Sequence, residues 1–189
     1  MKTSKIILLS TAAFFFILMF ATFFEMKAAM KDFEIAEIKT NKLEEFSAVV
    51  VKSGNSVTLT KSDKNELVSN AGMESVKISN DTLYIDSEEN IEVNFKNINY
   101  VSSINEGYLS ISDLNTNEFK LSFSNSSHII MHNVEIENLN IISDKSNISV
   151  VGDINKIKAN LTDGSVLRIN ANVNSLNIEC DEESTFSKY

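Results

Sequence analysis

Residues 123–165 read FSNSSHIIMHNVEIENLNIISDKSNISVVGDINKIKANLTDGS, and serines recur in and beyond them at a constant interval. The repeated serines are Ser127, Ser146, Ser165 and Ser184. An apolar residue or cysteine precedes each of them at a matching position, at Phe123, Ile142, Leu161 and Cys180. A fixed period of about 20 residues is typical of one supersecondary unit that is repeated and stacked. The pattern therefore predicts an all-β protein, a single-stranded β-helix or β-solenoid.

The chain from residue 114 onward divides into successive turns at 114–133, 134–153 and 154–172, with a partial turn from residue 173 onward. Each turn contains two short strands separated by a polar bend, made of the residue types that favour tight turns. After the bend apolar residues alternate, as at Ile148 and Val150, which places them on one face of a strand. Equivalent residues could then stack about 4.8 Å apart along the solenoid. An antiparallel sandwich is the alternative, since its strands also recur at short, regular intervals.

Residues 46–111 show the same alternation less regularly. We expect β structure throughout this part, with an irregular insertion between Leu59 and Val76. Proline is absent from the chain, which suits a protein built of β-ladders because proline cannot donate a ladder hydrogen bond. The β-solenoid domain is predicted to span residues 46–189.

The N-terminal segment is strongly apolar. Residues 6–24 carry no charge and follow Lys2 and Lys5, and a run of this length can cross a hydrocarbon core of about 30 Å. We therefore predict an N-terminal hydrophobic helix, with residues 1–29 acting as a membrane signal-anchor or as a cleaved signal peptide. Residues 30–45 are predicted to be a charged spacer. Either form of the segment would place the rest of the chain outside the cytoplasm, in the cell envelope.

The net charge of −9 argues against a nucleic-acid partner, because binding to phosphates depends on clustered Lys and Arg. Cys180 is the single cysteine, so an intrachain disulfide is excluded. Its place in the repeated apolar column predicts a buried, unreactive thiol.

Three acidic residues share one turn position at the spacing of the serines: Asp144, Asp163 and Glu182. Stacked carboxylates about 5 Å apart would repel one another, and a bound calcium ion would relieve the repulsion. This column is the candidate cation site, and solvated turns without an ion are the alternative. A second column, at Asp113, Asn133, Asp153 and Asn172, is predicted to form a corner ladder of side-chain hydrogen bonds.

His128 and His132 are the two histidines of the chain. Their spacing can ligate zinc on a helix, but on a strand it separates the residues by about 13 Å. We therefore assign them to the surface. No nucleophile elbow, phosphate-binding loop or zinc signature is present in the sequence, so it predicts no catalytic residue and no cofactor beyond the calcium just described.

The order of these units resembles a bacterial family, the auto-transporter adhesin head domain, also called the head GIN domain. The matching elements are an opening strand at residues 46–51, a second strand at 56–60, a unit at 80–85 and the successive rungs that follow. The resemblance covers about residues 43–186. The turns depart from the Ser-Gly-Ser-Gly pattern usual in that family, since only Gly164 remains in the regular rungs. The resemblance implies an exported bacterial β-solenoid and offers no catalytic residues.

Two functions follow as hypotheses. The first is a non-enzymatic surface or envelope module that holds a protein or glycan partner on a flat strand face or an exposed edge. The second is a carbohydrate-active enzyme, a glycan hydrolase or lyase that uses an acidic groove. An enzyme should present a concave cleft with converging carboxylates, whereas an adhesive module should present flat polar faces.

Overall fold

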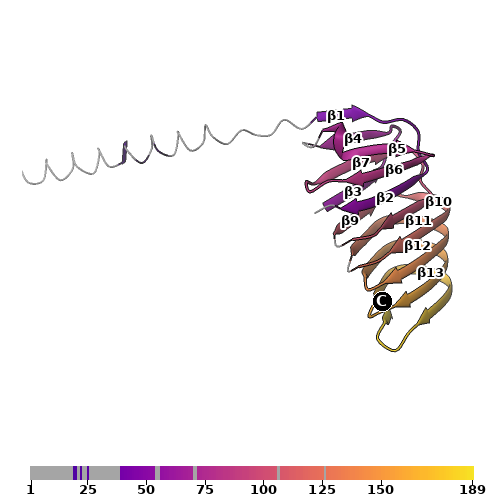
Figure 1. Ribbon diagram of the computed structural model, residues 1–189. Helices are drawn as coiled ribbons and strands as arrows, with labels where there is room; N and C mark the ends of the chain where they lie inside the picture. Colours follow the sequence, from indigo (N-terminus) through magenta and orange to yellow (C-terminus); the bar gives the residue numbers. More distant parts are fainter. Residues whose placement is uncertain are drawn as a thin grey trace, which may run out of the picture. The chain divides into compact units, whose positions relative to one another are not determined.

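The structure is a computed structural model that describes residues 19, 20, 22, 25, 39–53, 56–69, 72–105, 107–125 and 127–189. Residues Ile38–Tyr189 form one compact unit, and the described residues of this unit are almost entirely strands and turns. The strands coil into a β-solenoid of about four turns, as Figure 1 shows. The predicted fold class is therefore confirmed, and the antiparallel sandwich is wrong.

The first half of the unit consists of short strands. They are β1 (Lys39–Lys42), β2 (Ala48–Ser53), β3 (Ser56–Lys61), β4 (Glu66–Ser69), β5 (Val76–Ser79), β6 (Thr82–Asp86), β7 (Ile91–Phe95), β8 (Tyr100–Ser103) and β9 (Tyr108–Ser112). The second half has the longer strands β10 (Asn115–Phe123), β11 (His128–Asp144), β12 (Asn147–Thr162) and β13 (Val166–Cys180), followed by β14 (Thr185–Lys188). Consecutive long strands pair in parallel, residue by residue, as a stacked coil requires.

Each turn of the regular part has three faces. In β11 the inward, buried residues are Ile129 and Met131, then Val134 and Ile136, then Leu139 and Ile141. Two-residue steps within each pair are the β period, and three-residue steps between pairs mark bends. We call the surfaces outside residues 128–132, 134–138 and 139–144, together with their paired strands, the first, middle and last faces.

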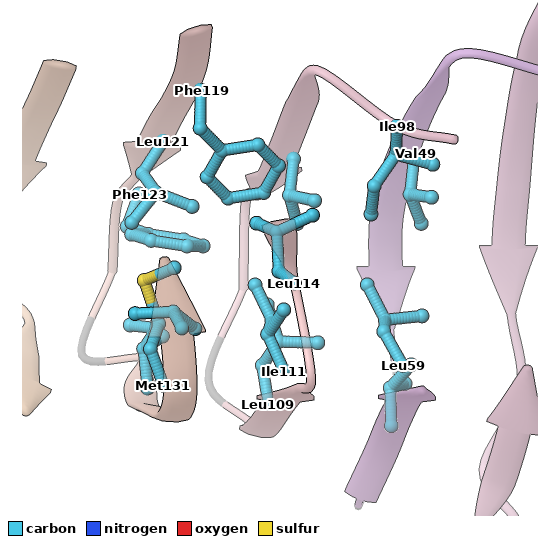
Figure 2. Packing of buried hydrophobic residues seen from close by; sticks show 14 of the residues in the cluster. Val49, Leu59, Ile98, Leu109, Ile111, Leu114, Phe119, Leu121, Phe123 and Met131 are labelled. Carbon is cyan, nitrogen blue, oxygen red and sulfur yellow. The ribbon is translucent and has the colours of Figure 1, made fainter. Parts of the chain in front are cut away.

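The interior is filled by columns of aliphatic and aromatic side chains. One column links Val49, Val101, Leu121, Ile141 and Ala159 through parallel register, and none of these is more than 2% exposed. A second column contains Leu59, Ile111, Met131 and Val150. Figure 2 shows several of these residues from neighbouring strands packed against one another. No single rung could bury its apolar face, so the core exists only because the rungs stack.

The spatial order of the first rungs differs from their order in the chain. Strand β2 lies between β6 and β8, and β3 lies between β7 and β9. The chain therefore enters at the rung of β2 and β3, builds the rung of β6 and β7 on its outer side, and then crosses back to β8 and β9. Antiparallel pairs of β1 with β4 and of β5 with β6 cover that end.

The expected insertion between Leu59 and Val76 contains β4 and a short 3₁₀ turn at Met73–Ser75. Strand β4 pairs antiparallel with β7 and β1. Part of the predicted spacer at 30–45 thus belongs to the β unit, because β1 pairs with β4 and Leu43 is only 4% exposed. Among the described residues of this unit the strands begin with β1 at Lys39, ahead of residue 46.

The predicted N-terminal helix at 1–29 lies almost wholly outside the described residues. Within the described part of the chain, no helix has the length and apolar character needed to span a membrane.

Two members of the predicted apolar column, Ile142 and Cys180, are exposed and not buried in the core as their column predicted. Ile142 is 48% exposed, because it pairs with Ser122 and Asn160 while Ser143 pairs with Phe123 and Leu161. Strand β11 has one more corner residue than β12, at a bulge between Met131 and Val134. A shift of one residue turns every side chain of a strand to the opposite face.

Cys180 pairs with Leu161, as its place in the predicted column requires. It is nevertheless exposed and not buried as predicted. The reason lies at the end of the described stack. Strand β14 pairs with Val166–Ile169 of β13, so among the described strands none covers Cys180 from that side.

The four repeated serines form a buried hydrogen-bonded corner. Ser127, Ser146 and Ser165 are at most 1% exposed. Ser165 is the central member, because its hydroxyl donates to the Thr162 carbonyl over 2.7 Å and accepts from the Ser143 hydroxyl and the Ser146 amide. These serines position the turns of successive rungs.

Replacing Ser165 with alanine should lower the free energy of unfolding by about 1–3 kcal/mol, because it leaves the buried Ser143 hydroxyl and Ser146 amide without an acceptor. Urea denaturation followed by circular dichroism measures the change. Ser175→Ala, at an exposed position of β13, should change it by less than about 0.5 kcal/mol. Equal effects of the two substitutions would contradict the role of the serine corner.

Gly152→Ala should lower the free energy of unfolding by about 2–3 kcal/mol through strain and overlap. Gly152 has φ of +155°, and a Cβ there would lie 2.1 Å from the Val134 carbonyl oxygen on the next strand. Gly164→Ala is the matched control, because Gly164 has φ of +77° with no atom within 4 Å of the added carbon. It should cost only about 1 kcal/mol. Thermal and urea denaturation of both variants measure the difference, and a control as damaging as Gly152→Ala would exclude the steric explanation.

Candidate functional site

The two histidines lie on the outer surface of the first face, where the sequence placed them. The His128 ring stacks on the Tyr108 ring at 5.6 Å between centroids and an interplanar angle of 16°. His132 Nε2 lies 3.5 Å from the Ser110 hydroxyl. Among the described residues no three His, Cys, Asp or Glu side chains are grouped so that they could hold a metal ion.

The proposed cation column is not aligned by the register of the strands. Asp144 pairs with Thr162 and not with Asp163. The Asp163 amide donates over 2.7 Å to Asp181 Oδ2, and Glu182 is exposed on the same last turn. Calcium binding by Asp144, Asp163 and Glu182 therefore stays a prediction.

Asp181 is a structural carboxylate that the sequence analysis missed. Its Oδ1 accepts the amides of Ser184 at 2.8 Å and Glu183 at 3.2 Å. Hydrogen bonds from the Ser184 side chain and then from the Asp163 amide lower the pKa of Asp181 below its ordinary value of 3.8. An Asp at the first position of a turn that ends in Ser is the signal that could have identified it.

The middle face carries a ladder of amide and carboxylate side chains, which we call the amide–carboxylate ladder. Its first row consists of Asn115, Glu135, Asp153 and Asn172, which are aligned by strand pairing. Asn115 Nδ2 donates to Glu135 Oε2, and Asn172 Nδ2 donates to Asp153 Oδ1, each over 2.7 Å.

A second row runs beside the first. Asn155 Nδ2 donates to Glu137 Oε1, and Asn174 Nδ2 donates to Asn155 Oδ1 over 2.8 Å. Between the rows, Ile136 and Ile154 point inward and are at most 3% exposed. The β period alone places the polar side chains outward in two parallel rows.

The predicted corner ladder is divided between two separate groups of hydrogen-bonded residues. It was expected to contain Asp113, Asn133, Asp153 and Asn172. Asn133 Nδ2 donates to Asp113 Oδ1 at the bend, where both residues have positive φ, +54° and +60°. Asp153 and Asn172 belong to the amide–carboxylate ladder, two register positions away. The extra corner residue of β11 explains why the prediction failed. After this residue, β11 pairs with β12 at an interval one residue shorter than the spacing of the serines, so Asp153 lies beside Glu135 and not beside Asn133.

The ladder surrounds a shallow hollow of about 340 Å³. At its centre, Glu135 and Asp153 are paired on adjacent strands, and two like charges at that separation repel each other. Each carboxylate accepts an amide hydrogen from its outer side, so their remaining lone pairs can accept hydrogen bonds from a ligand. Hydroxyl groups are suited to this surface because carboxylates accept from them and amides both donate and accept.

Titration of Asp181 should report the structure of the last turn. A carboxylate whose folded-state pKa is lowered stabilises the fold above its ordinary pKa, and this contribution is lost as the pH falls through the lowered value. NMR amide shifts of Asp163 and Ser184 should therefore change with a midpoint below pH 3.8. Asp181→Asn should abolish this titration. A midpoint at or above 3.8 would contradict the described hydrogen bonds.

Two solved bacterial structures are similar to this chain. One is described as a "putative adhesin" from Bacteroides fragilis NCTC 9343. It has a TM-score of 0.54 at 14% identity, covering 81% of this chain and 96% of that chain. The other, described as a "Putative lipid binding protein" from Parabacteroides distasonis ATCC 8503, has a TM-score of 0.46 at 11% identity, with the same coverage. At such identities the likeness concerns the fold alone.

No curated protein matches the chain. The family described as "Putative auto-transporter adhesin, head GIN domain" matches residues 45–187. That range coincides closely with the β-solenoid, and it confirms the resemblance carried by the strand units at 46–51, 56–60 and 80–85. By this match over most of its length, the chain belongs to the head GIN domain family.

Proposed function

We propose that this protein is a non-enzymatic, exported envelope module that binds a hydroxyl-rich glycan on the amide–carboxylate ladder. The observation that carries the proposal is the pair Glu135 and Asp153, flanked on both sides by amides that already donate to them. A sugar hydroxyl that donates into this pair would relieve the repulsion between two adjacent carboxylates.

The form of the surface also favours binding over catalysis. The ladder is an open face of parallel strands, whereas hydrolysis of a glycosidic bond needs an acid and a second carboxylate on either side of a bound sugar. Glu135 and Asp153 stand side by side on neighbouring strands of one sheet, and each already accepts a hydrogen bond from an amide of the same face. Such a row can hold a chain of sugars without enclosing a bond between them.

Export and surface location are parts of the same proposal. The uncharged run at residues 6–24 supports a signal-anchor or a signal peptide. A signal-anchor would attach the protein to the membrane, and a cleaved signal peptide would release it. Membership of a family described as an adhesin head domain supports a cell-surface or extracytoplasmic role.

A glycan-binding screen with the full chain in neutral detergent tests the proposal. Glu135→Gln combined with Asp153→Asn should weaken binding to a neutral glycan about tenfold or more, because charge-assisted hydrogen bonds contribute about 1.5–3 kcal/mol each. Titration calorimetry with the glycan found in the screen gives the affinity.

Glu183→Gln is the control, since Glu183 is an exposed carboxylate on the last turn, outside both the ladder and the predicted cation column. It should leave the affinity unchanged. Equal binding by the wild-type chain and the double variant would refute the ladder as the site, and release of reducing sugars from the glycan would show an enzyme instead.

A further inference from the structure

The amide–carboxylate ladder extends over four neighbouring strands of the middle face. Strands β10, β11, β12 and β13 pair in parallel along it, and each contributes one side chain to the first row. Among the described strands, β8 pairs with β10 only from Lys120 onward and β14 pairs with β13 only as far as Ile169, so neither extends the middle face. The ladder therefore offers four successive positions along the stack.

These positions follow one another at the spacing of the strands, about 4.8 Å. The two rows of the ladder are two residues apart along each strand, which corresponds to about 6.6 Å. Sugars joined by β-1,4 linkages form a flat, extended ribbon in which neighbouring rings follow one another at close to the strand spacing. The hydroxyl groups of each ring stand on the two edges of that ribbon. A ribbon that lies along the stack would thus place one ring over each strand and one edge over each row.

The central positions of the ladder are hydrogen-bond acceptors. Glu135 and Asp153 each use one oxygen to accept from the amide of an outer neighbour, over 2.7 Å in both cases. In the second row Glu137 accepts from Asn155. The remaining lone pairs of these carboxylates need donors, so sugars at the central positions must keep free hydroxyl groups. A sugar that carries its own carboxylate would be repelled there.

The outer positions of the ladder are amides. Asn115 and Asn172 end the first row, and Asn174 donates to Asn155 over 2.8 Å at the β13 end of the second row. An amide can both donate and accept, so these positions can hold a sugar hydroxyl in either role. None of the described residues that line the hollow is cationic. The surface is thus suited to a neutral, unsubstituted glycan.

We propose that the ladder holds four sugars of an extended, neutral β-1,4-linked glycan that runs along the stack, with one ring over each strand. This binding mode rests on the proposed function and adds to it the shape of the glycan, its direction and the number of sugars held. A coiled α-1,4-linked glycan fits less well, because its successive rings turn away from a straight row.

Cello-oligosaccharides of two to six glucose units are the test ligands, and titration calorimetry with the full chain in neutral detergent measures their affinity. The affinity should rise with each sugar up to cellotetraose, because every added ring reaches a further strand. From cellotetraose to cellohexaose it should change by less than about threefold, since the extra rings find no further position.

Maltotetraose is the matched ligand, because it contains the same four glucose units joined by α-1,4 linkages. It should bind at least about tenfold more weakly than cellotetraose, since its shape does not match the row of strands.

Asn172→Ala combined with Asn174→Ala removes the position on β13. This variant should bind cellotriose within about twofold of the wild-type chain, and its affinity should stop rising at three sugars instead of four. Asn177→Ala is the matched control, because Asn177 is an exposed asparagine of the same strand on the last face. It should keep the rise up to four sugars.

Three results would overturn this binding mode: equal affinity for cellotetraose and maltotetraose, a rise that continues through cellohexaose, or a plateau that the Asn172→Ala/Asn174→Ala variant leaves at four sugars. The absence of binding to every cello-oligosaccharide would overturn it as well. The proposed function would survive these results if another glycan bound to the wild-type chain and lost affinity in the Glu135→Gln/Asp153→Asn variant.

Discussion

Every feature of this protein depends on the parallel backbone ladder that joins each turn to the next. Strand pairing fixes which residues lie above one another, and the two-residue period of a strand then fixes which of them point inward. The columns of the core, the buried serine corner and the rows on the outer faces are consequences of this one register. No rung has a core of its own, so a disturbance of the ladder is felt as a loss of both backbone bonds and apolar packing.

Much of the fold could be predicted from the sequence because the serines recur at a constant spacing, and the strands that follow them pair at the same spacing. Ser127, Ser146 and Ser165 lie one strand apart, immediately before strands that pair at the same interval. Away from the serine corner, the number of residues between paired positions differs from the spacing of the serines. It is one residue larger between β10 and β11, and one residue smaller between the later part of β11 and β12. Ile142 was misplaced for this reason. The extra residue at the corner of β11 leaves the alternation of apolar and polar residues within each strand intact. The alternation therefore gives no sign of the shift.

The candidate site was only partly predictable. Asp153 and Asn172 were recognised as members of a hydrogen-bonded column, but their partners Glu135 and Asn115 were hidden by the same shift in register. The interleaved order of β5, β6, β2 and β8 also could not be predicted from the sequence. A repeat is visible in a sequence, whereas a crossover between rungs leaves no periodic signal.

That interleaving gives the two ends of the solenoid different mechanical behaviour. A pull on the C-terminal side would peel β14 from β13 and then each following rung from its neighbour, so that the hydrogen bonds break in succession at low force. A pull from the N-terminal side would first detach β1 and then act on β2, which is clamped between β6 and β8. There the bonds on both edges of the strand share the load at once. A module tethered by its N-terminal side would thus hold its shape under tension while its far end could yield one turn at a time.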